Sequence, residues 1–250
     1  MPDMERTPMD AAEGRRIHGR ALWDFFRGDR SASLVLHSDL GEHDEIPVSV
    51  FFREPPNFFP FDKAALELCR GRVLDVGAGT GVHSLVLQAR GFSVCAIDIL
   101  PQAIDIMQKR GVRQAYLADA FGLAAATFDT VLMLMNGIGI VGDLDGLDRF
   151  LYGAHRLLGP GGQILVDSAD LRPRREAARR VPGYPRRADG RYIGEAQIQL
   201  EYRGEKGEPF PELYVDPDTL AHYAERNGWE SEVVFRGEAG GYLARLTERL

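Results

Sequence analysis

The sequence has little of several features that would mark a specialised class of protein. Its 250 residues include two cysteines, Cys69 and Cys95, too few for a disulfide framework or a four-cysteine zinc site. Basic residues are not in excess, because 30 Lys and Arg stand against 37 Asp and Glu and leave a net charge of −7. This acidic balance disfavours a non-specific nucleic-acid coat, although it is compatible with a local basic site.

Long hydrophobic runs are also missing. The most apolar run covers residues 131–135, far shorter than the roughly 20 residues that span a bilayer. Residues 1–16 are polar and charged, without the apolar centre of a secretory signal, so we expect a cytoplasmic protein with no membrane partner. The remaining composition, 44% hydrophobic and 27% charged, is that of a globular protein with a sizeable core.

Between residues 61 and 168, short apolar runs alternate with amphipathic segments. The runs predict strands at residues 72–76, 92–97, 128–135 and 163–167, the last one entered through a glycine turn at residues 159–162. The first intervening helix is predicted to bury the face that carries Val82, Leu85, Val86 and Ala89. Strands alternating with helices of this length predict a doubly wound α/β sheet with parallel strands.

The rest of the chain is organised differently. A helix at residues 217–227 precedes two short strands, residues 232–235 and 242–246, whose short glycine-rich connection predicts antiparallel pairing at an edge of the sheet. We therefore predict an N-terminal cap or lid at residues 1–60 and a sheet domain at residues 61–250. The sheet domain would contain an inserted basic segment at about residues 169–215.

The most specific motif is VLDVGAGTG at residues 73–81. It follows a predicted strand and opens a predicted helix, the context in which glycines let the backbone approach a ligand. The dinucleotide pattern G-x-G-x-x-G does not fit, because Val82 stands at the third glycine position and Gly81 comes one residue early. No lysine follows to make a phosphate-binding loop of the Walker type.

An acid followed by Gly-x-Gly-x-Gly resembles the first motif of class I S-adenosylmethionine-dependent methyltransferases. The resemblance covers residues 65–170 and implies a seven-stranded Rossmann-like sheet, mostly parallel, with its last strand reversed. It also implies that Asp98 holds the ribose and that Asp119 contacts the adenine amino group, although Asp119 can equally be a loop or cap residue. The positions implied to bind S-adenosylmethionine are Asp75, Gly77, Ala78, Gly79, Gly81, Asp98, Ile99, Asp119, Ala120 and Met135.

The reaction that the resemblance implies is methyl transfer to a small-molecule acceptor. Such a cofactor carries its own leaving group, so the protein mainly orients the acceptor and excludes water, and no fixed catalytic dyad is required. Asn136 would orient the acceptor or cap a loop, and His37 would act as a base if the N-terminal segment folds over the pocket. No residues have metal-ligand spacing, so we predict no metal.

Other functions share the same sequence features. A methyltransferase acting on protein or RNA, a non-catalytic cofactor-binding module and an oxidoreductase on a similar sheet are the alternatives. The glycine spacing disfavours the oxidoreductase. After the strand at residues 128–135, the chain also lacks the Asn/Asp-Pro-Pro-aromatic motif of enzymes that methylate nucleic-acid amino groups.

The N-terminal segment contains a cluster of phenylalanines. Strand-like runs at residues 33–36 and 46–52 flank Gly41, and Phe51, Phe52, Phe58, Phe59 and Phe61 lie in or after the second run. These aromatics would form a lid over the cofactor and the acceptor, or a satellite hydrophobic cluster that packs the first helix onto the sheet.

The basic segment contains eight arginines within residues 172–191. Against Glu176 and Asp189 they give it a net charge of +6, which leaves −13 for the rest of the chain. One interpretation is that the arginines hold an anionic acceptor such as a carboxylate or phosphate. The other interpretation is that the segment is exposed to solvent and that its arginines form ion pairs with acidic residues of the rest of the chain. Nucleic acid is disfavoured because only Tyr184 and Tyr192 are interleaved with the arginines.

Overall fold

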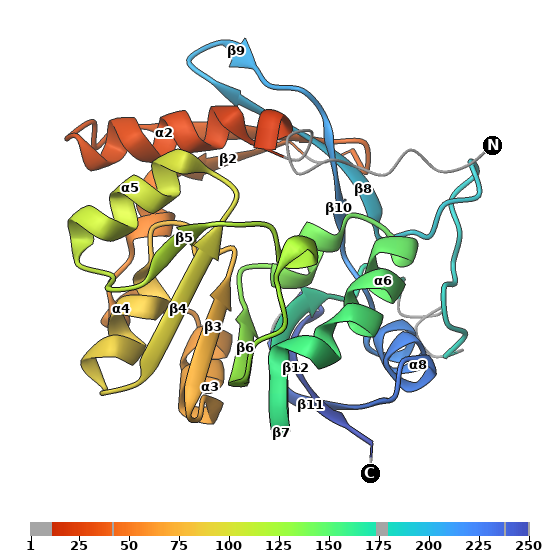
Figure 1. The fold of residues 1–250 in the computed structure, drawn as a ribbon. Helices are drawn as coiled ribbons and strands as arrows, with labels where there is room; N and C mark the ends of the chain where they lie inside the picture. Colours follow the sequence, from red (N-terminus) through yellow and green to blue (C-terminus); the bar gives the residue numbers. More distant parts are fainter. Residues whose placement is uncertain (1–11, 42, 174–179, 238, 250) are drawn as a thin grey trace.

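The computed structural model describes residues 12–41, 43–173, 180–237 and 239–249, which form two sheets (Figure 1). The larger sheet has seven strands in the order β11-β12-β7-β6-β3-β4-β5. Their bounds are β3 (Arg72–Val76), β4 (Ser93–Asp98), β5 (Ala115–Leu117), β6 (Phe128–Met133), β7 (Leu158–Ala169), β11 (Trp229–Arg236) and β12 (Gly241–Glu248). Strands β7, β6, β3, β4 and β5 pair parallel, whereas β12 pairs antiparallel with both of its neighbours.

This sheet confirms the predicted α/β class with seven mostly parallel strands and a reversed last strand. The predicted antiparallel pair forms one edge of the sheet, with β11 outermost and β12 between β11 and β7. A short connection fixes the antiparallel pairing of β11 with β12. It does not determine which of the two strands takes the place beside β7.

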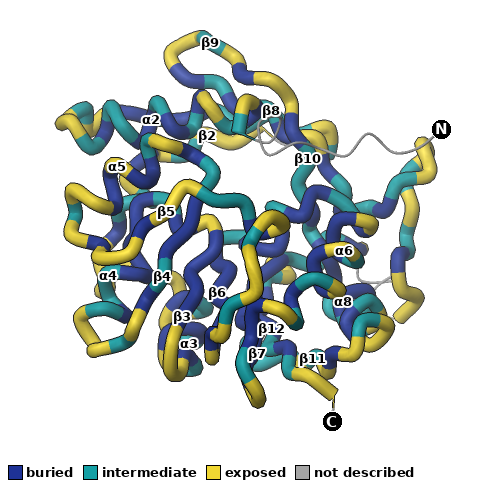
Figure 2. Tube along the Cα trace, viewed as in Figure 1, coloured by how far each residue is buried: buried dark blue, intermediate teal, exposed yellow. Residues whose placement is uncertain are grey.

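Helices cover both faces of the larger sheet. Alternate residues of a strand point to opposite faces, so Leu74 packs in the core under α6 (Leu144–Ala154) and α8 (Pro217–Arg226), whereas Val73 packs on the other face. That other face is covered by α3 (Pro60–Leu68) and α4 (Val82–Ala89), and α5 (Pro101–Arg110) packs beside them over β4 and β5. Both faces are therefore dry, which explains the continuous apolar runs, and Figure 2 shows the central strands as buried.

Several element boundaries differ from the prediction. Strand β6 ends at Met133, because Met135 and Asn136 have positive φ angles of 67° and 55°. The glycines at 159–162 lie within β7 instead of a turn, because a bulge absorbs them: Phe128 pairs with Leu158, and Thr130 pairs with Gln163.

The buried face predicted for α4 is wrong in part. Ala89 is exposed and Leu87 is fully buried. The reason is that this short helix packs in two directions. Leu87 faces the sheet core, whereas Leu85 faces the cluster formed by α5.

The second sheet combines segments that lie far apart in the sequence. Its order is β10-β8-β1-β2, all antiparallel, with β9 (Glu205–Lys206) paired to β8. β1 (Ser33–Ser38) and β2 (His43–Pro47) come from the predicted cap, and β8 (Glu195–Tyr202) and β10 (Phe210–Leu213) come from the predicted insert. The run expected to continue as a strand to residue 52 instead forms the 3₁₀ helix η1 (Val48–Phe52).

The second sheet and α2 (Arg16–Phe26) lie above the carboxyl ends of β3 and β4 (Figure 1). Helix α2 packs against α5 and β8, and it shares a separate core with β1, β8 and β10. We call α2 and this sheet the cap. Its position over the carboxyl ends matters because open α/β sheets bind their ligands there.

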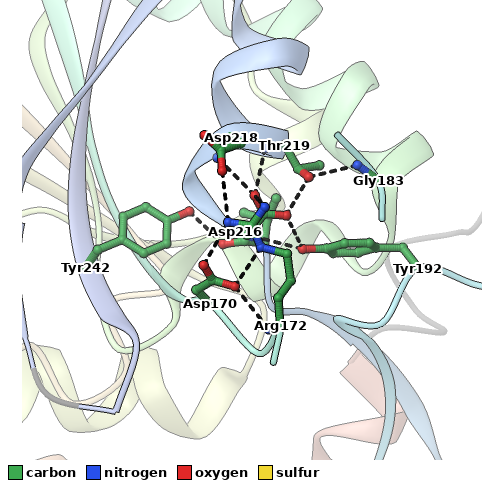
Figure 3. A network of polar contacts seen from close by, with 9 residues as sticks. Asp170, Arg172, Gly183, Tyr192, Asp216, Asp218, Thr219 and Tyr242 are labelled. Carbon is green, nitrogen blue, oxygen red and sulfur yellow. Dashed lines mark hydrogen bonds and ion pairs between the residues drawn. The ribbon is translucent and has the colours of Figure 1, made fainter. Parts of the chain in front are cut away.

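A buried polar network holds the insert to the larger sheet (Figure 3). Asp216 is fully buried, forms an ion pair with Arg172 at 2.9 Å, and accepts a hydrogen bond from the Tyr192 hydroxyl at 2.6 Å. It also caps α8 by accepting from the backbone amides of Asp218 and Thr219, both at 2.9 Å. These contacts join the start of the insert, at Arg172, to its end, at Asp216.

We predict that Arg172→Met destabilises the protein far more than Arg180→Met does. The first change leaves the Asp216 carboxylate buried without its cation, which costs about 3–5 kcal/mol, whereas Arg180 is exposed. The free energy of unfolding from urea denaturation measures both, and an exposed change should stay within about 0.5 kcal/mol. Equal losses for the two variants would contradict a structural role for the ion pair.

Candidate functional site

A cavity of about 1170 Å³ lies between the carboxyl edge of the larger sheet and the cap. Its wall brings together nine of the ten residues that the family resemblance assigns to the cofactor, although they span 61 sequence positions. They are Asp75, Gly77, Ala78, Gly79, Asp98, Ile99, Asp119, Ala120 and Met135.

Gly81, the tenth residue, is not part of the wall. Its φ is +78°, and a Cβ there would lie 2.8 Å from Val112 Cγ2 and 3.0 Å from Met107 Cγ. Gly81 is thus needed for close packing of α4 against the residues around α5. A Cβ on Gly77 or Gly79, by contrast, would meet no atom within 4 Å, so these two glycines keep the wall open beside the loop.

Two of the acidic residues that line the cavity, Asp98 and Asp75, have separate local settings. Asp98 ends β4 and accepts hydrogen bonds from the amides of Gly79 and Leu100, each at 2.9 Å, and burial raises its pKa. Asp75 accepts from the Ser84 hydroxyl at 2.5 Å, and burial raises its pKa as well. A ligand that donates hydrogen bonds would stabilise the charged form of either group.

Asp119 confirms one of its two expectations, the capping role, and its contact with adenine stays a prediction. Its Oδ1 accepts from the Phe121 amide at 2.8 Å and so caps the 3₁₀ helix η3 (Ala120–Gly122), while the residue also lines the cavity. Because β5, β4, β3 and β6 are neighbours, Asp119, Asp98, the glycine loop and Met135 follow one another along the sheet edge. This row suits an elongated ligand with several hydrogen-bond donors.

A buried cluster of Arg53, Asp62 and His83 lies next to this row, and no sequence motif predicts these three residues as a unit. Arg53 Nε lies 3.1 Å from Asp62 Oδ2, and His83 Nε2 lies 3.3 Å from Asp62 Oδ1. Burial alone would raise the pKa of Asp62, but hydrogen bonds and charge from His83 and Arg53 outweigh it and lower the pKa. Arg53 also contacts Met135 Sδ at 3.0 Å, so the cluster connects the segment that follows η1 to the cavity wall.

Only one member of that cluster has a local sequence signal. Asp62 is the third residue of α3, and its carboxylate accepts from the Phe59 amide at 3.0 Å, as an acid near a helix start often does. Arg53 precedes α3 in an irregular segment, and His83 follows the glycine loop. Their contact depends on tertiary packing alone.

Asn136 lines the cavity, but its side chain is held by the protein. Its Nδ2 donates to Glu212 Oε1 at 3.0 Å, and its Oδ1 accepts from the Ser168 hydroxyl at 3.2 Å. Asp167 fixes the turn by accepting from the amides of Asn136 and Gly137 at 3.1 and 2.8 Å. The geometry favours the loop-anchoring alternative for Asn136 over direct orientation of an acceptor.

His37 lies outside the cavity, so the structure does not support it as a base. Its ring contacts His43 Nδ1 and Glu201 Oε2, both at 2.9 Å. The physical reason is strand alternation: Leu34 and Leu36 of β1 line the cavity, and His37 points to the opposite face.

The basic segment pairs with acidic residues instead of lining the main cavity. Arg172 is buried among Asp170, Asp216 and Asp218, and Arg187 and Arg191 contact Asp39 at 2.9 and 2.6 Å. Arg174, Arg175 and Arg179 lie outside the described residues. None of the segment's described arginines lines the main cavity, which favours the interpretation that the segment pairs with the acidic body.

Within the described ranges, no three or more His, Cys, Asp or Glu side chains are grouped so that they could hold a metal ion. Over the same residues, no helix combines the length and the hydropathy needed to cross a membrane.

Comparison with known proteins gives matches over the sheet domain and over the whole chain. Residues 73–162 match the family model of a methyltransferase domain. A crystal structure of an S-adenosylmethionine-dependent methyltransferase from Bacteroides fragilis, in complex with S-adenosyl-L-homocysteine, is 38% identical with a TM-score of 0.82. That match covers 95% of this chain and 97% of that one. The CcbJ methyltransferase from Streptomyces caelestis has a TM-score of 0.60 over 80% of this chain and 92% of that one, and at 16% identity it supports the fold alone.

Curated relatives match over a shorter region. The cypemycin N-terminal methyltransferase of a Streptomyces species is 33% identical over 102 residues, 39% of this chain. The demethylmenaquinone methyltransferase of Tropheryma whipplei (strain Twist) is 31% identical over 99 residues, 38% of this chain. The match spans 42% and 40% of the length of these two relatives.

Alanine at Gly79 and at Gly81 should have different consequences. Both glycines have positive φ, so each alanine costs about 1–2 kcal/mol of strain. Gly81→Ala also clashes with Val112 and Met107 and should lower the free energy of unfolding by about 1–3 kcal/mol more than Gly79→Ala. Gly79→Ala should cause the larger loss of affinity for S-adenosylhomocysteine, measured by calorimetry. The reverse order in either measurement would contradict these assignments.

Asp167 should make the stability depend on pH. Burial raises its pKa to about 6, above the ordinary value near 3.9, so the folded protein keeps a proton that the unfolded chain releases. The contribution of Asp167 to the free energy of unfolding is therefore present at low pH and is lost as the pH rises through 6. Relative to Asp167→Asn, the wild-type protein should lose on the order of 2 kcal/mol between pH 4 and pH 7 in urea denaturation. Parallel pH profiles for the two proteins would rule the effect out.

Proposed function

This chain belongs to the class I S-adenosylmethionine-dependent methyltransferases, and from that membership we propose that it transfers a methyl group to a small-molecule acceptor held under the cap. It is an enzyme, and its cofactor is S-adenosylmethionine. The choice of a small molecule as acceptor is the proposal.

The cavity itself carries the proposal. Its volume of about 1170 Å³ exceeds the roughly 300–1,000 Å³ typical of a pocket for one ligand. One side is the row of Asp119, Asp98 and the glycine loop, and the other side is lined by aliphatic side chains of the cap such as Leu34 and Ile198. Two compartments of this kind suit a polar cofactor and an apolar acceptor that lie side by side.

The residues present fit the cofactor. The open space beside Gly77 and Gly79 admits a ligand close to the backbone, and Asp98 and Asp119 line the same cavity. This supports the proposal that their carboxyls accept hydrogen bonds from the ribose and from the adenine amino group. When bound, the cofactor supplies an electrophilic methyl group on a sulfonium leaving group. The chain then has to align the acceptor and exclude water, which is what an enclosing cap does.

The shape of the acceptor side supports a small molecule over a polymer. The cap covers the carboxyl edge, and three of the described arginines of the basic segment, Arg172, Arg187 and Arg191, are held in ion pairs. Relatives named for demethylmenaquinone and for ubiquinone biosynthesis support the same class. A peptide amine is the alternative that the name of the cypemycin N-terminal methyltransferase raises.

Binding measurements should discriminate cofactors. We expect S-adenosylhomocysteine to bind in calorimetry and NAD to give no heat at millimolar concentration. Asp98→Asn should lower the affinity for S-adenosylhomocysteine at least about ten-fold, because one buried acceptor becomes a donor. Asp105→Asn, at an exposed position of α5, is the matched control and should leave the affinity unchanged. Tight NAD binding in place of S-adenosylhomocysteine would overturn the assignment of the cofactor.

Transfer of a labelled methyl group to three pools of acceptors separates the remaining alternatives. Small phenols and amines should be labelled, whereas total RNA and unfolded protein should not. Labelling confined to RNA or protein would reject the small-molecule proposal. No labelling of any pool, despite cofactor binding, would favour a non-catalytic module.

A further inference from the structure

The cap side of the cavity has a mainly aliphatic wall. Side chains from α2, β1, β2 and β8 converge on it from two segments of the chain. They are Leu22, Leu34, Leu36, Ile46, Ile198 and Leu200. Contact between such a wall and an apolar ligand is favourable, because each Å² of apolar surface removed from water contributes roughly 25 cal/mol of free energy.

The charges on this side of the cavity cancel. Arg15 and Glu212 form an ion pair with a separation of 3.8 Å, and Glu212 is further held by Asn136 Nδ2 at 3.0 Å. Arg15 also stacks over the Phe210 ring, with its guanidinium carbon 4.1 Å from the ring centroid. An ion pair that is already satisfied gives a charged ligand no partner for its own charge.

The other charged residues of the cavity wall come from elements outside the cap. Asp75, Asp98 and Asp119 form the cofactor row. Arg156 lies just after α6, on the side of Asp119, where it donates to the Phe121 carbonyl at 2.6 Å. Asp143 and Asp145 lie at the start of α6, where they also line a second pocket with Arg186 and Arg191. The wall that α2, β1, β2 and β8 form is mainly aliphatic, and the polar residues beside it include the Arg15–Glu212 ion pair, Tyr214 and His18.

His18, on α2, is the polar group of the cap that these contacts do not explain. It lines the cavity, its ring packs against Phe51 with 4.6 Å between centroids, and its Nε2 is buried without a hydrogen-bond partner among the described residues. Burial, with a smaller effect from the charge of Arg15, lowers its pKa to about 4, so the ring is neutral near pH 7. Buried polar atoms rarely lack a partner, and one that does calls for an explanation such as a bound water, an ion or a functional role.

We propose that the methyl acceptor is an uncharged, mainly apolar molecule whose hydroxyl group forms a hydrogen bond with His18. The proposal rests on the function proposed above. A neutral imidazole has one nitrogen that donates and one that accepts, and a hydroxyl can do both, so it pairs with Nε2 in either tautomer. A carboxylate or an ammonium group would instead lose its hydration without gaining a counter-charge. Since Nε2 is shielded in this structure, the pairing includes a rotation of the ring about the Cβ–Cγ bond.

Three probes of one shape test the proposal on the protein saturated with S-adenosylhomocysteine. They are 2-naphthol, 2-naphthoate and 2-naphthylmethylammonium, with affinities measured by calorimetry. The naphthol should bind at least about ten-fold more tightly than either charged probe. Tighter binding of a charged probe, or binding of none of the three, overturns the proposal.

Variants then test the role of His18. His18→Phe should lower the naphthol affinity about ten-fold and leave the two charged probes unchanged, whereas His18→Gln, which can still donate and accept, should recover part of the loss. His222→Phe removes an exposed histidine of α8 and is the matched control. Unchanged naphthol binding in His18→Phe contradicts the role of His18.

The affinity for S-adenosylhomocysteine is measured first in every variant. It reports whether the variant is folded, and it distinguishes failure of the proposed function from failure of the proposed acceptor. Loss of cofactor binding in the wild-type protein would reject the proposed function. Intact cofactor binding with the wrong probe preference would reject only the hydroxyl acceptor.

Discussion

The buried ion pair between Arg172 and Asp216 is the interaction on which the position of the cap depends. It lies where the chain leaves the larger sheet for the insert and where it returns, so it fixes both ends of the insert at one point. A buried charge pair is stable only when its remaining polar atoms are satisfied. Tyr192, Thr219 and the amides at the start of α8 meet that condition for Asp216.

The opposite side of the cap is tied to the glycine loop. Thr80 of the loop donates to the Phe51 carbonyl, and Arg53 joins Asp62 of α3 to His83 of α4. The cap is therefore held at both sides of the cavity, by the Asp216 network and by the Arg53 cluster. Fixed walls on two sides make a compartment with defined chemistry, which is why the pairing of Arg15 with Glu212 and the isolation of His18 bear on the acceptor.

Local signals predicted much of the sheet and of the cofactor row. Continuous apolar runs marked β3, β4, β6 and β7, and the family resemblance carried by the glycine motif identified nine residues of the cavity wall. The cap could not be predicted in this way, because Leu36 of β1 pairs with Leu200 of β8 across 164 positions, and no local pattern encodes such a pair. His37 and His18 also look equivalent in the sequence. Only strand alternation and helix packing turn one away from the cavity and leave the other on its wall.

We expect the cofactor to lie along the carboxyl edge of the sheet, with its sulfur toward the compartment under the cap. A crystal structure of the protein with S-adenosylhomocysteine tests this placement directly. We predict adenine beside Asp119, ribose beside Asp98, and the sulfur facing the aliphatic wall that carries Leu34 and Ile198. A nucleoside inside the cap compartment, or a sulfur that points away from it, would contradict this placement.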